Sequence, residues 1–191
     1  MHFTKIHLIN WINFFPMKIL LHACCAPCGG QVINELKKQG HEVAVFFFNP
    51  NVYPQEEYEL RMKEVKRYCD KLGVELIEGK YEHPEWLEKV KGHESDPEKG
   101  DRCRICFAAR LSEVAQVAAE LGFEAIATTL TISPHKPADI VNQVGEEVCG
   151  LYGLKFINDI WRKNDGYKKS CQISHDEDFH RQDYCGCEFS R

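Results

Sequence analysis

The chain has 191 residues, 43% of them hydrophobic and 11% aromatic, and a formal net charge of −5. This length and apolar content predict a single folded domain with one substantial core, and they exclude a disordered chain. The slightly acidic balance excludes a broad electrostatic attraction to nucleic acid or to anionic membranes, although it leaves room for a local basic patch.

Residues 1–16 contain an apolar stretch, MHFTKIHLINWINFF, followed by Pro16. Polar residues interrupt the stretch, its one lysine makes a weak basic region, and no small-residue cleavage site follows, so it does not resemble a secretory signal. It is also too short and too polar to span a bilayer. Because Met17 stands directly before the first predicted strand, we expect residues 1–16 to be an extension outside the fold. We therefore expect a cytoplasmic protein without a membrane partner.

Strands and helices alternate along the rest of the chain. Residues 18–40 are predicted to form a short apolar strand, a tight loop and an amphipathic helix that ends at a glycine. A buried strand is predicted over 42–50, a helix over 54–73, a strand over 74–79, a short helix over 83–92 and a charged surface loop over 93–101. A strong helix over 102–122 then leads to a strand over 124–131, a loop and helix over 132–153, and a last strand over 154–158.

This alternation requires crossover connections, which build a parallel sheet that is covered on both faces. The predicted fold class is therefore α/β, with a doubly wound, Rossmann-like sheet in a core of residues 17–158. From residue 159 the periodicity fades. Residues 159–191 are predicted to form an irregular, cysteine-containing cap over the active edge of the sheet, completing a metal site within the same single domain.

Ten cysteines is a high count for a chain of this size. Seven of them fall into three close groups: Cys24, Cys25 and Cys28; Cys103 and Cys106; Cys185 and Cys187. Clustered cysteines in a cytoplasmic chain indicate metal binding or redox chemistry more than stable disulfides. Of the other three, Cys69 and Cys149 are expected in the core, and Cys171 is assigned no role.

The three groups are expected to converge. Ligands of open parallel sheets bind beyond the carboxyl ends of the strands, and the first group directly follows the first strand. The second group opens a helix, and the cap brings the third. Adjacent cysteines such as Cys24 and Cys25 are awkward ligands for one ion, and seven thiols exceed the four that a structural zinc takes. An iron–sulfur centre is therefore favoured, with structural zinc and thiol–disulfide exchange left as alternatives.

The segments LLHACCAPC, FFFNPNVYPQEEYELR, RCRICFAARL, TTLTISPHK and HRQDYCGCEFS occur in this order from Lys18 to the C-terminus. Together they resemble the epoxyqueuosine reductases of the QueH type, which catalyse the last step of tRNA queuosine synthesis without cobalamin. The resemblance implies an oxidoreductase with a fold related to the nucleotide α-hydrolases, in which thiols replace a phosphate-binding loop.

The resemblance also implies a [4Fe–4S] cluster, whose ligands on this chain are Cys24, Cys25, Cys103 and Cys106. The terminal Cys185 and Cys187 match a redox-active pair or the ligands of a second, mononuclear iron. Cys28 is a further candidate ligand for that second metal, and Asp159 is another whose register is loose.

The implied reaction removes the epoxide oxygen of epoxyqueuosine in a tRNA anticodon, and it consumes two electrons and two protons. An unidentified electron donor is therefore a second partner. Four residues near the motifs are candidate proton donors: His22, His135, His180 and Tyr184. The basic residues that can meet the tRNA near the cysteines are Arg102, Arg104, Arg110, His135, Lys136, Arg162, Lys163, Lys168 and Lys169.

Two other functions compete with the reductase. One is a zinc-stabilised, nucleotide-handling enzyme of the same fold, but the first loop lacks a serine- and glycine-rich phosphate cradle. The other is a non-catalytic electron-transfer module, although small ferredoxin-type carriers do not need an α/β domain of this size.

Overall fold

The computed structural model describes residues 16–190, so the expected extension lies outside the described residues except for Pro16. In the described part, five parallel strands form one sheet in the order β3-β2-β1-β4-β5. The strands are β1 (Lys18–His22), β2 (Glu42–Phe47), β3 (Leu76–Glu78), β4 (Ala125–Thr128) and β5 (Lys155–Phe156). The predicted parallel α/β sheet is thereby confirmed.

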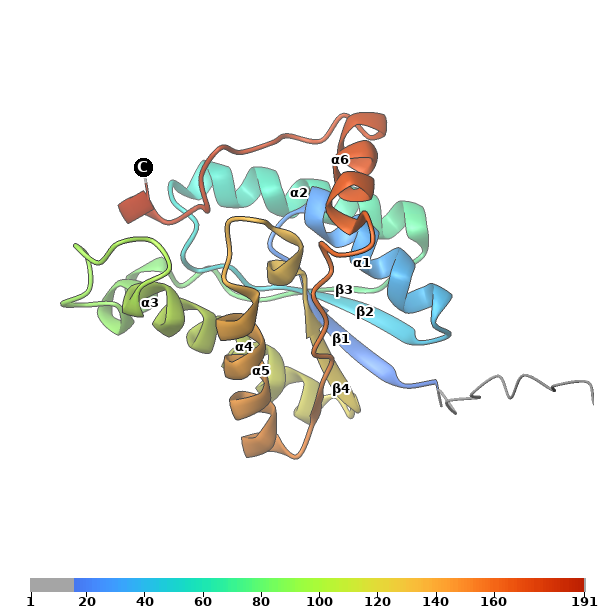
Figure 1. The fold of residues 1–191 in the computed structure, drawn as a ribbon, viewed down its shortest axis with the longest axis horizontal. Coiled ribbons are helices and arrows are strands. Elements are labelled where there is room, and N and C mark those ends of the chain that lie inside the picture. The colour runs from blue at the N-terminus through green and yellow to red at the C-terminus, as the bar shows by residue number, and fades with distance from the viewer. Residues whose placement is uncertain (1–15, 191) are drawn as a thin grey trace, which may run out of the picture.

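Helices cover both faces of this sheet (Figure 1). The α-helices are α1 (Ala26–Lys38), α2 (Gln55–Leu72), α3 (His83–Lys89), α4 (Asp101–Glu120), α5 (Ala138–Tyr152) and α6 (Gly166–Asp176). Two short 3-10 turns are η1 (Thr129–Ile132) and η2 (Glu188–Ser190). No helix in residues 16–190 is long and apolar enough to cross a membrane.

The central strand β1 explains the double winding. Ile19 and Leu21 point into one core cluster with residues of α1 and α2, whereas Leu20 points into a second cluster with residues of α4 and α5. Side chains alternate between the two faces of a strand, so a strand covered on both sides is apolar at every position. All three residues are 0% exposed.

The strand order reverses at β1, which pairs with β2 on one side and with β4 on the other. His22, at the end of β1, is in register with Thr128, at the end of β4. The loops that follow these two strands diverge onto opposite faces of the sheet, which opens a crevice at this edge. The first cysteine group follows β1 directly, and Thr129 follows β4.

The strands predicted over 42–50, 74–79, 124–131 and 154–158 are all shorter than expected, and the third of them is cut short by a turn. The strand predicted over 124–131 ends at Thr128, and η1 replaces its last residues. The Thr128 hydroxyl accepts a hydrogen bond from the Leu130 amide at 3.2 Å. Threonine side chains that bond a backbone amide two residues on favour a turn over a strand. The turn brings Thr129 to the edge of the sheet that carries the cysteines.

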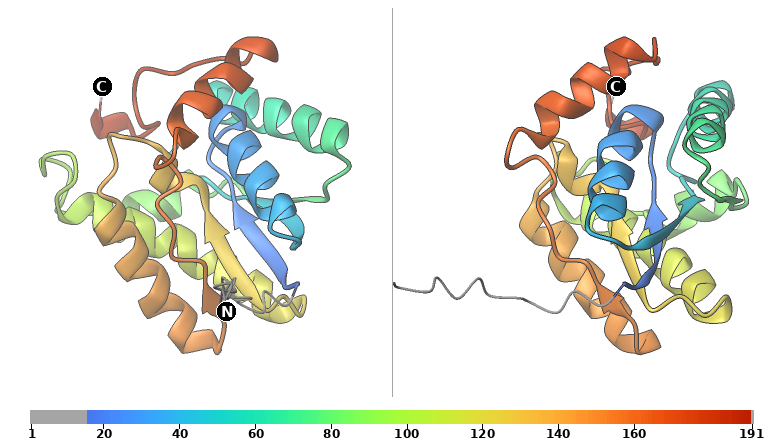
Figure 2. Two further views of the ribbon diagram at one scale, coloured as in Figure 1. Left: turned by 45° about the vertical axis from the view of Figure 1, so that its right-hand side comes forward. Right: turned by 90° about the vertical axis from the view of Figure 1, so that its right-hand side faces the viewer.

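The C-terminal cap contains a helix, α6, that the sequence pattern did not predict. It lies over the start of α1 in both views of Figure 2. Ser170 donates a hydrogen bond to the Pro27 carbonyl at 2.6 Å, and Ile173 lies beside Gly30, where a Cβ would come within 3.1 Å of its Cγ2. Ser170 and Ser174 are buried, and because such residues are small and polar, no apolar stripe marks the helix.

Beyond α6 the chain returns along α2 to the site. Phe179 packs edge-on against Tyr68 at 5.3 Å, and the His180 amide donates to the Glu64 carboxylate at 2.8 Å. The segment then crosses the top of Figure 1 to the loop that precedes α4. There the Arg102 guanidinium, itself 2% exposed, contacts the Phe189 ring.

Candidate metal centre

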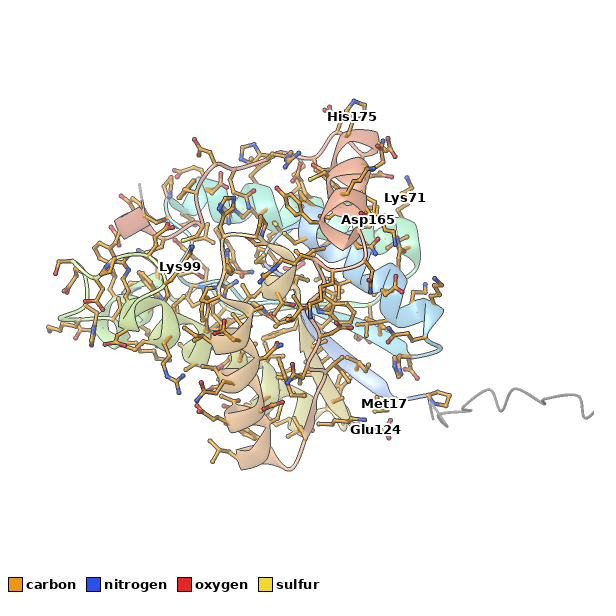
Figure 3. The ribbon with its side chains drawn as sticks, viewed as in Figure 1. Met17, Lys71, Lys99, Glu124, Asp165 and His175 are labelled. Carbon is orange, nitrogen blue, oxygen red and sulfur yellow. The ribbon has the colours of Figure 1, made fainter. Side chains whose placement is uncertain are left out.

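A cavity of about 390 Å³ lies at the carboxyl edge of the sheet. In Figure 3, Lys99 marks the loop into α4 and Asp165 the start of α6, the elements on either side of it, whereas Met17 and Glu124 mark the opposite edge of the sheet. The cysteines among its lining residues are Cys24, Cys25, Cys28, Cys103, Cys106, Cys171, Cys185 and Cys187. None of them is in a disulfide. All seven motif cysteines therefore face one cavity, and Cys171, to which no role was assigned, joins them.

The first group forms a compact triad at the N-terminus of α1. The thiol sulfurs of Cys24, Cys25 and Cys28 all lie within 4.8 Å of one another, and those of Cys24 and Cys25 are 3.7 Å apart. Thr129, in the turn after β4, fixes Cys24, because its hydroxyl accepts from the Cys24 amide at 3.3 Å and contacts the Cys24 sulfur at 3.5 Å. The helix N-terminus favours negative charge at this position.

The three thiols have unequal acidities. Hydrogen bonds from the Cys25 and Cys28 thiols hold the pKa of Cys24 well below its usual value, and the nearby cations Lys136 and Arg110 lower it further. The same hydrogen bond to Cys24 is the main reason that the pKa of Cys25 is raised to about 12. Of the three thiols, Cys24 is therefore the most readily ionised, and the ionised form of a thiol is the one that binds metals.

The second group lies on another wall of the cavity. Cys103 and Cys106 stand in the first two turns of α4, where the Lys99 amide donates to the Cys103 sulfur at 3.2 Å. Cys106 is buried against Trp86 and Cys187. Burial raises the pKa of both thiols. In residues 16–190, the triad is the only group of three or more cysteines whose sulfurs all lie within 4.8 Å. The four predicted cluster ligands therefore share a cavity, but their sulfurs do not all lie within 4.8 Å of one another.

The third group is held by the loop after β2 and by α2. The Gly186 carbonyl accepts from the Tyr53 amide at 2.8 Å, and the Cys185 carbonyl accepts from the Arg61 guanidinium at 3.3 Å. The Cys187 thiol and the Ser190 hydroxyl, both hydrogen-bonded to the Cys185 sulfur, lower the pKa of Cys185 to about 5, and the same coupling raises that of Cys187. One thiolate beside one thiol is the protonation state from which a redox pair reacts.

Gly186 lets the terminal motif approach α2. Its φ is +107°, and a Cβ there would lie 3.0 Å from Arg61 Nη1 and 3.0 Å from Val52 Cγ2.

We expect Gly186→Ala to reduce the free energy of unfolding in urea by about 1–3 kcal/mol, from backbone strain plus the close approach. Gly122→Ala is the matched control, because Gly122 also has a positive φ, +72°, but its Cβ would meet nothing within 4 Å. A loss at Gly186 no larger than at Gly122 would contradict the close packing of the motif.

A sequence profile of the family described as "Epoxyqueuosine reductase QueH" matches residues 19–191. The proteins of that name from Acinetobacter baylyi and Streptococcus pyogenes are each 39% identical to the chain, over 91% and 90% of its length and over 80% and 69% of theirs. The chain belongs to the QueH family. The resemblance in the motifs is thereby confirmed.

Solved structures with the same fold are more distant. The U34-tRNA thiolase NcsA from Methanococcus maripaludis, solved with its [4Fe–4S] cluster, has a TM-score of 0.56 at 12% identity, over 92% of this chain and 60% of that one. A predicted subunit of tRNA methyltransferase from Methanocaldococcus jannaschii has a TM-score of 0.53 at 14% identity, over 82% of this chain and 74% of that one. At these identities the likeness shows a shared fold.

The other predicted site residues of this QueH protein differ in whether they line the cavity. Among the predicted proton donors, His135 and Tyr184 line the cavity. His22 is 0% exposed beneath it, and His180 pairs with Glu57 on α2 at 3.3 Å. Asp159 does not line the cavity, since its exposed carboxylate accepts from the Ile160 amide at 2.6 Å. Cys69 and Cys149 are core residues, each 1% exposed, as predicted.

Only some of the residues in the predicted basic patch are exposed. Arg102 and Arg110 are each 2% exposed, so neither is free to contact a phosphate backbone. Their spacing from Cys106, four residues on either side, places all three on one face of α4, a signal that could have identified both arginines as cavity residues. Asp183 and Arg181 line the cavity from the cap and were not singled out in the sequence.

The cavity carries most of the unpaired polar groups of the protein. In residues 16–190, six buried side-chain polar atoms have no hydrogen-bond partner. Five belong to residues that line the cavity: Asn51 Oδ1, Arg61 Nη2, Trp86 Nε1, Arg110 Nε and Ser174 Oγ. Buried polar atoms are normally paired, and their concentration here fits a space built around an occupant. Because two of the five belong to guanidinium groups, that occupant is expected to be anionic.

Proposed function

We propose that this QueH protein reduces epoxyqueuosine to queuosine in tRNA at the cysteine-lined cavity. The convergence of all seven motif cysteines on the crevice between β1 and β4 carries this proposal. The reaction takes the oxygen out of the epoxide as water and leaves an alkene, so it consumes two electrons and two protons. It places the protein in the cytoplasm with tRNA, and a separate electron donor supplies the reducing equivalents.

The residues of the cavity fit an iron–sulfur cluster. Thiolates are the ligands such clusters take, and the unpaired donors of Arg61, Trp86 and Arg110 suit the negative charge of a thiolate-bound cluster. We assign Cys24, Cys25, Cys103 and Cys106 as the ligands of a [4Fe–4S] cluster. When bound, the cluster supplies electrons one at a time.

Cys185 and Cys187 are the proposed source of the two electrons. Joining the Cys185 thiolate and the Cys187 thiol in a disulfide releases two electrons and one proton, so the second proton that the epoxide needs must come from another group. The alternative role of these thiols is to hold a second, mononuclear iron, with Cys28 as a further ligand. Counting iron per protein separates the two roles, as described in the Discussion.

A proton must reach the departing oxygen. His135 is exposed on the η1–α5 loop and lines the cavity, so it can exchange protons with solvent and with a bound substrate. Tyr184 also lines the cavity, and its hydroxyl donates to the Tyr53 carbonyl at 2.8 Å, which fixes the direction of the ring. We therefore propose His135 as the acid, with Tyr184 as the group that orients the substrate.

The tRNA is proposed to approach across the first turn of α6. Lys168 and Lys169 are exposed there, next to Tyr167, which lines the cavity and is 39% exposed. Lysines recognise phosphates, and an exposed ring can stack on a base that is splayed out of an anticodon loop.

Replacing Lys168 and Lys169 together by glutamine should weaken tRNA binding several-fold and reduce its salt dependence, by a log–log slope of about 0.7 for each phosphate that the protein no longer neutralises. A filter-binding titration at several salt concentrations measures both effects. The matched control replaces Lys38 and Lys155, which are exposed at the opposite edge of the sheet. Equal losses of affinity in both double variants would contradict a tRNA surface on α6.

The deciding experiment is an anaerobic absorption spectrum with iron, zinc and acid-labile sulfide counted on the same sample. We expect a broad absorption band at about 400 nm that bleaches with dithionite, and we expect iron and sulfide in the same sample. Conversion of epoxyqueuosine tRNA by the same sample, read by nucleoside mass spectrometry, tests the activity. A colourless protein with one zinc and no sulfide after reconstitution would overturn the proposal, and a reversible cluster without turnover would favour an electron-transfer module.

A further inference from the structure

Arg110 is a buried cation whose charge no carboxylate balances. It stands on α4 and is 2% exposed. In residues 16–190 it forms no ion pair within 4.0 Å, whereas Arg61 and Arg104 each pair with a glutamate. Its Nε has no acceptor, although it is buried. An unpaired buried charge costs several kcal/mol, so such a group is expected to face a negative charge of another kind.

The guanidinium is clamped beside the first cysteine loop. Its Nη2 donates to the Asn49 side-chain oxygen, and the Asn49 amide nitrogen donates to the Ala23 carbonyl at 3.0 Å. Asn49 is 0% exposed, and Ala23 directly precedes Cys24. The cation is therefore held in one place relative to the triad by a neutral amide, which cannot balance its charge as a carboxylate would.

The neighbouring histidine brings no carboxylate to Arg110. His22 contacts Thr128 Oγ1 at 2.9 Å through Nδ1 and the Phe48 carbonyl at 3.2 Å through Nε2. Both ring nitrogens are thus occupied by neutral oxygen atoms.

Arg102, on the same helix, is a buried arginine with a structural role. It is equally buried, at 2% exposed, but its Nη1 donates to the carbonyls of Glu94 at 2.7 Å and Asp96 at 2.6 Å. Those carbonyls belong to the loop before α4, so Arg102 fastens that loop. Within the described part of the chain Arg110 has no comparable backbone partners, and its unpaired Nε belongs to a residue of the cavity wall.

We propose that Arg110 is a positioning residue that balances the negative charge of the metal centre and raises its reduction potential. This inference rests on the proposed iron–sulfur function. A cluster bound by four thiolates is negatively charged, and reduction adds one further negative charge. A fixed cation in a low-dielectric site stabilises the reduced form more than the oxidised form, so it favours uptake of the electron.

The test is a redox titration of the anaerobically reconstituted full chain, followed by its cluster absorbance and by electron paramagnetic resonance. Arg110→Met removes the charge and keeps much of the length. We expect its equilibrium constant for cluster reduction to fall at least tenfold, a shift of about 59 mV to more negative potential for a one-electron couple. Arg110→Lys, which keeps the charge, should restore more than half of this shift.

Arg104→Met is the matched control, because Arg104 adjoins Cys103 in sequence but its side chain is 41% exposed and pairs with Glu147 at 2.9 Å. Its potential should equal that of the wild type, since solvent screens the charge. A fully loaded Arg110→Met protein with the wild-type potential would overturn the inference.

If Arg110→Met does not fold, Arg110→Lys decides the question. A reduction potential equal to that of the wild type supports a role of the charge, whereas a tenfold or larger change in the equilibrium constant for cluster reduction contradicts it. A wild-type protein that takes up no cluster would overturn the proposed function together with this inference. A loaded wild type with unchanged variants overturns the inference alone.

Discussion

Cys24→Ala should yield a folded protein that carries no iron–sulfur absorbance and has no measurable reductase activity. Cys24 is the one thiol of the triad whose pKa is lowered, and Thr129 holds it in place from the turn after β4. Its removal takes away the proposed ligand that follows β1, where the strand order reverses. Neither of the other two triad thiols is ionised as readily. Turnover should fall by a factor of at least about 10³, because the electron source is lost.

Circular dichroism, iron and sulfide counts, and nucleoside mass spectrometry check this expectation on one sample. Cys149→Ala is the matched control: that thiol is 1% exposed in the core between α4 and α5, so its removal leaves a small cavity and costs about 1 kcal/mol of stability. It should keep the cluster and the activity. A Cys24→Ala protein with a full complement of iron and sulfide would remove Cys24 from the ligand set.

The second large effect is expected at the terminal motif. Cys185→Ser and Cys187→Ser should each keep the absorbance of the cluster and lose turnover by at least about 10³-fold, because a serine hydroxyl can neither form a disulfide nor serve as a comparable soft ligand. Both residues line the cavity from the cap, and Cys187 packs in one cluster with Cys106 of α4.

Iron counting then distinguishes the two proposed roles. If the pair is a redox couple, the serine variants contain as much iron as the wild type. If the pair holds a mononuclear iron, they contain about one iron fewer with unchanged sulfide. Loss of the whole cluster in either variant would instead make these cysteines cluster ligands and contradict the assignment of Cys103 or Cys106.

Local rules predicted the sheet well. Strands such as β1 and β2 are buried on both faces, so unbroken apolar runs mark them, and glycines end the helices between them. The convergence of the cysteines followed from topology, because the carboxyl ends of parallel strands share one edge. Those two arguments need no knowledge of side-chain packing.

What the sequence did not reveal depends on contacts between distant residues. Ser170 and Ser174 bury small polar side chains against α1, which no hydrophobic period records. The inward direction of Arg110 depends on Asn49, 61 residues earlier in the chain. Asp159 has a carboxylate that could bind a metal, but it stands just beyond the two-residue strand β5, where it is exposed.

The way in which α6 is attached has a kinetic consequence. The helix and the segment after it are held on α1 and α2 by apolar contacts of Ile173 and Phe179 and by polar bonds such as that of Ser170 to Pro27. Opening this wall exposes those side chains but leaves the packing of the sheet against α1, α2, α4 and α5 intact, so it can open as a unit while the sheet stays folded. We therefore expect iron and sulfide to enter through transient release of α6, at a rate governed by that local opening and independent of global unfolding.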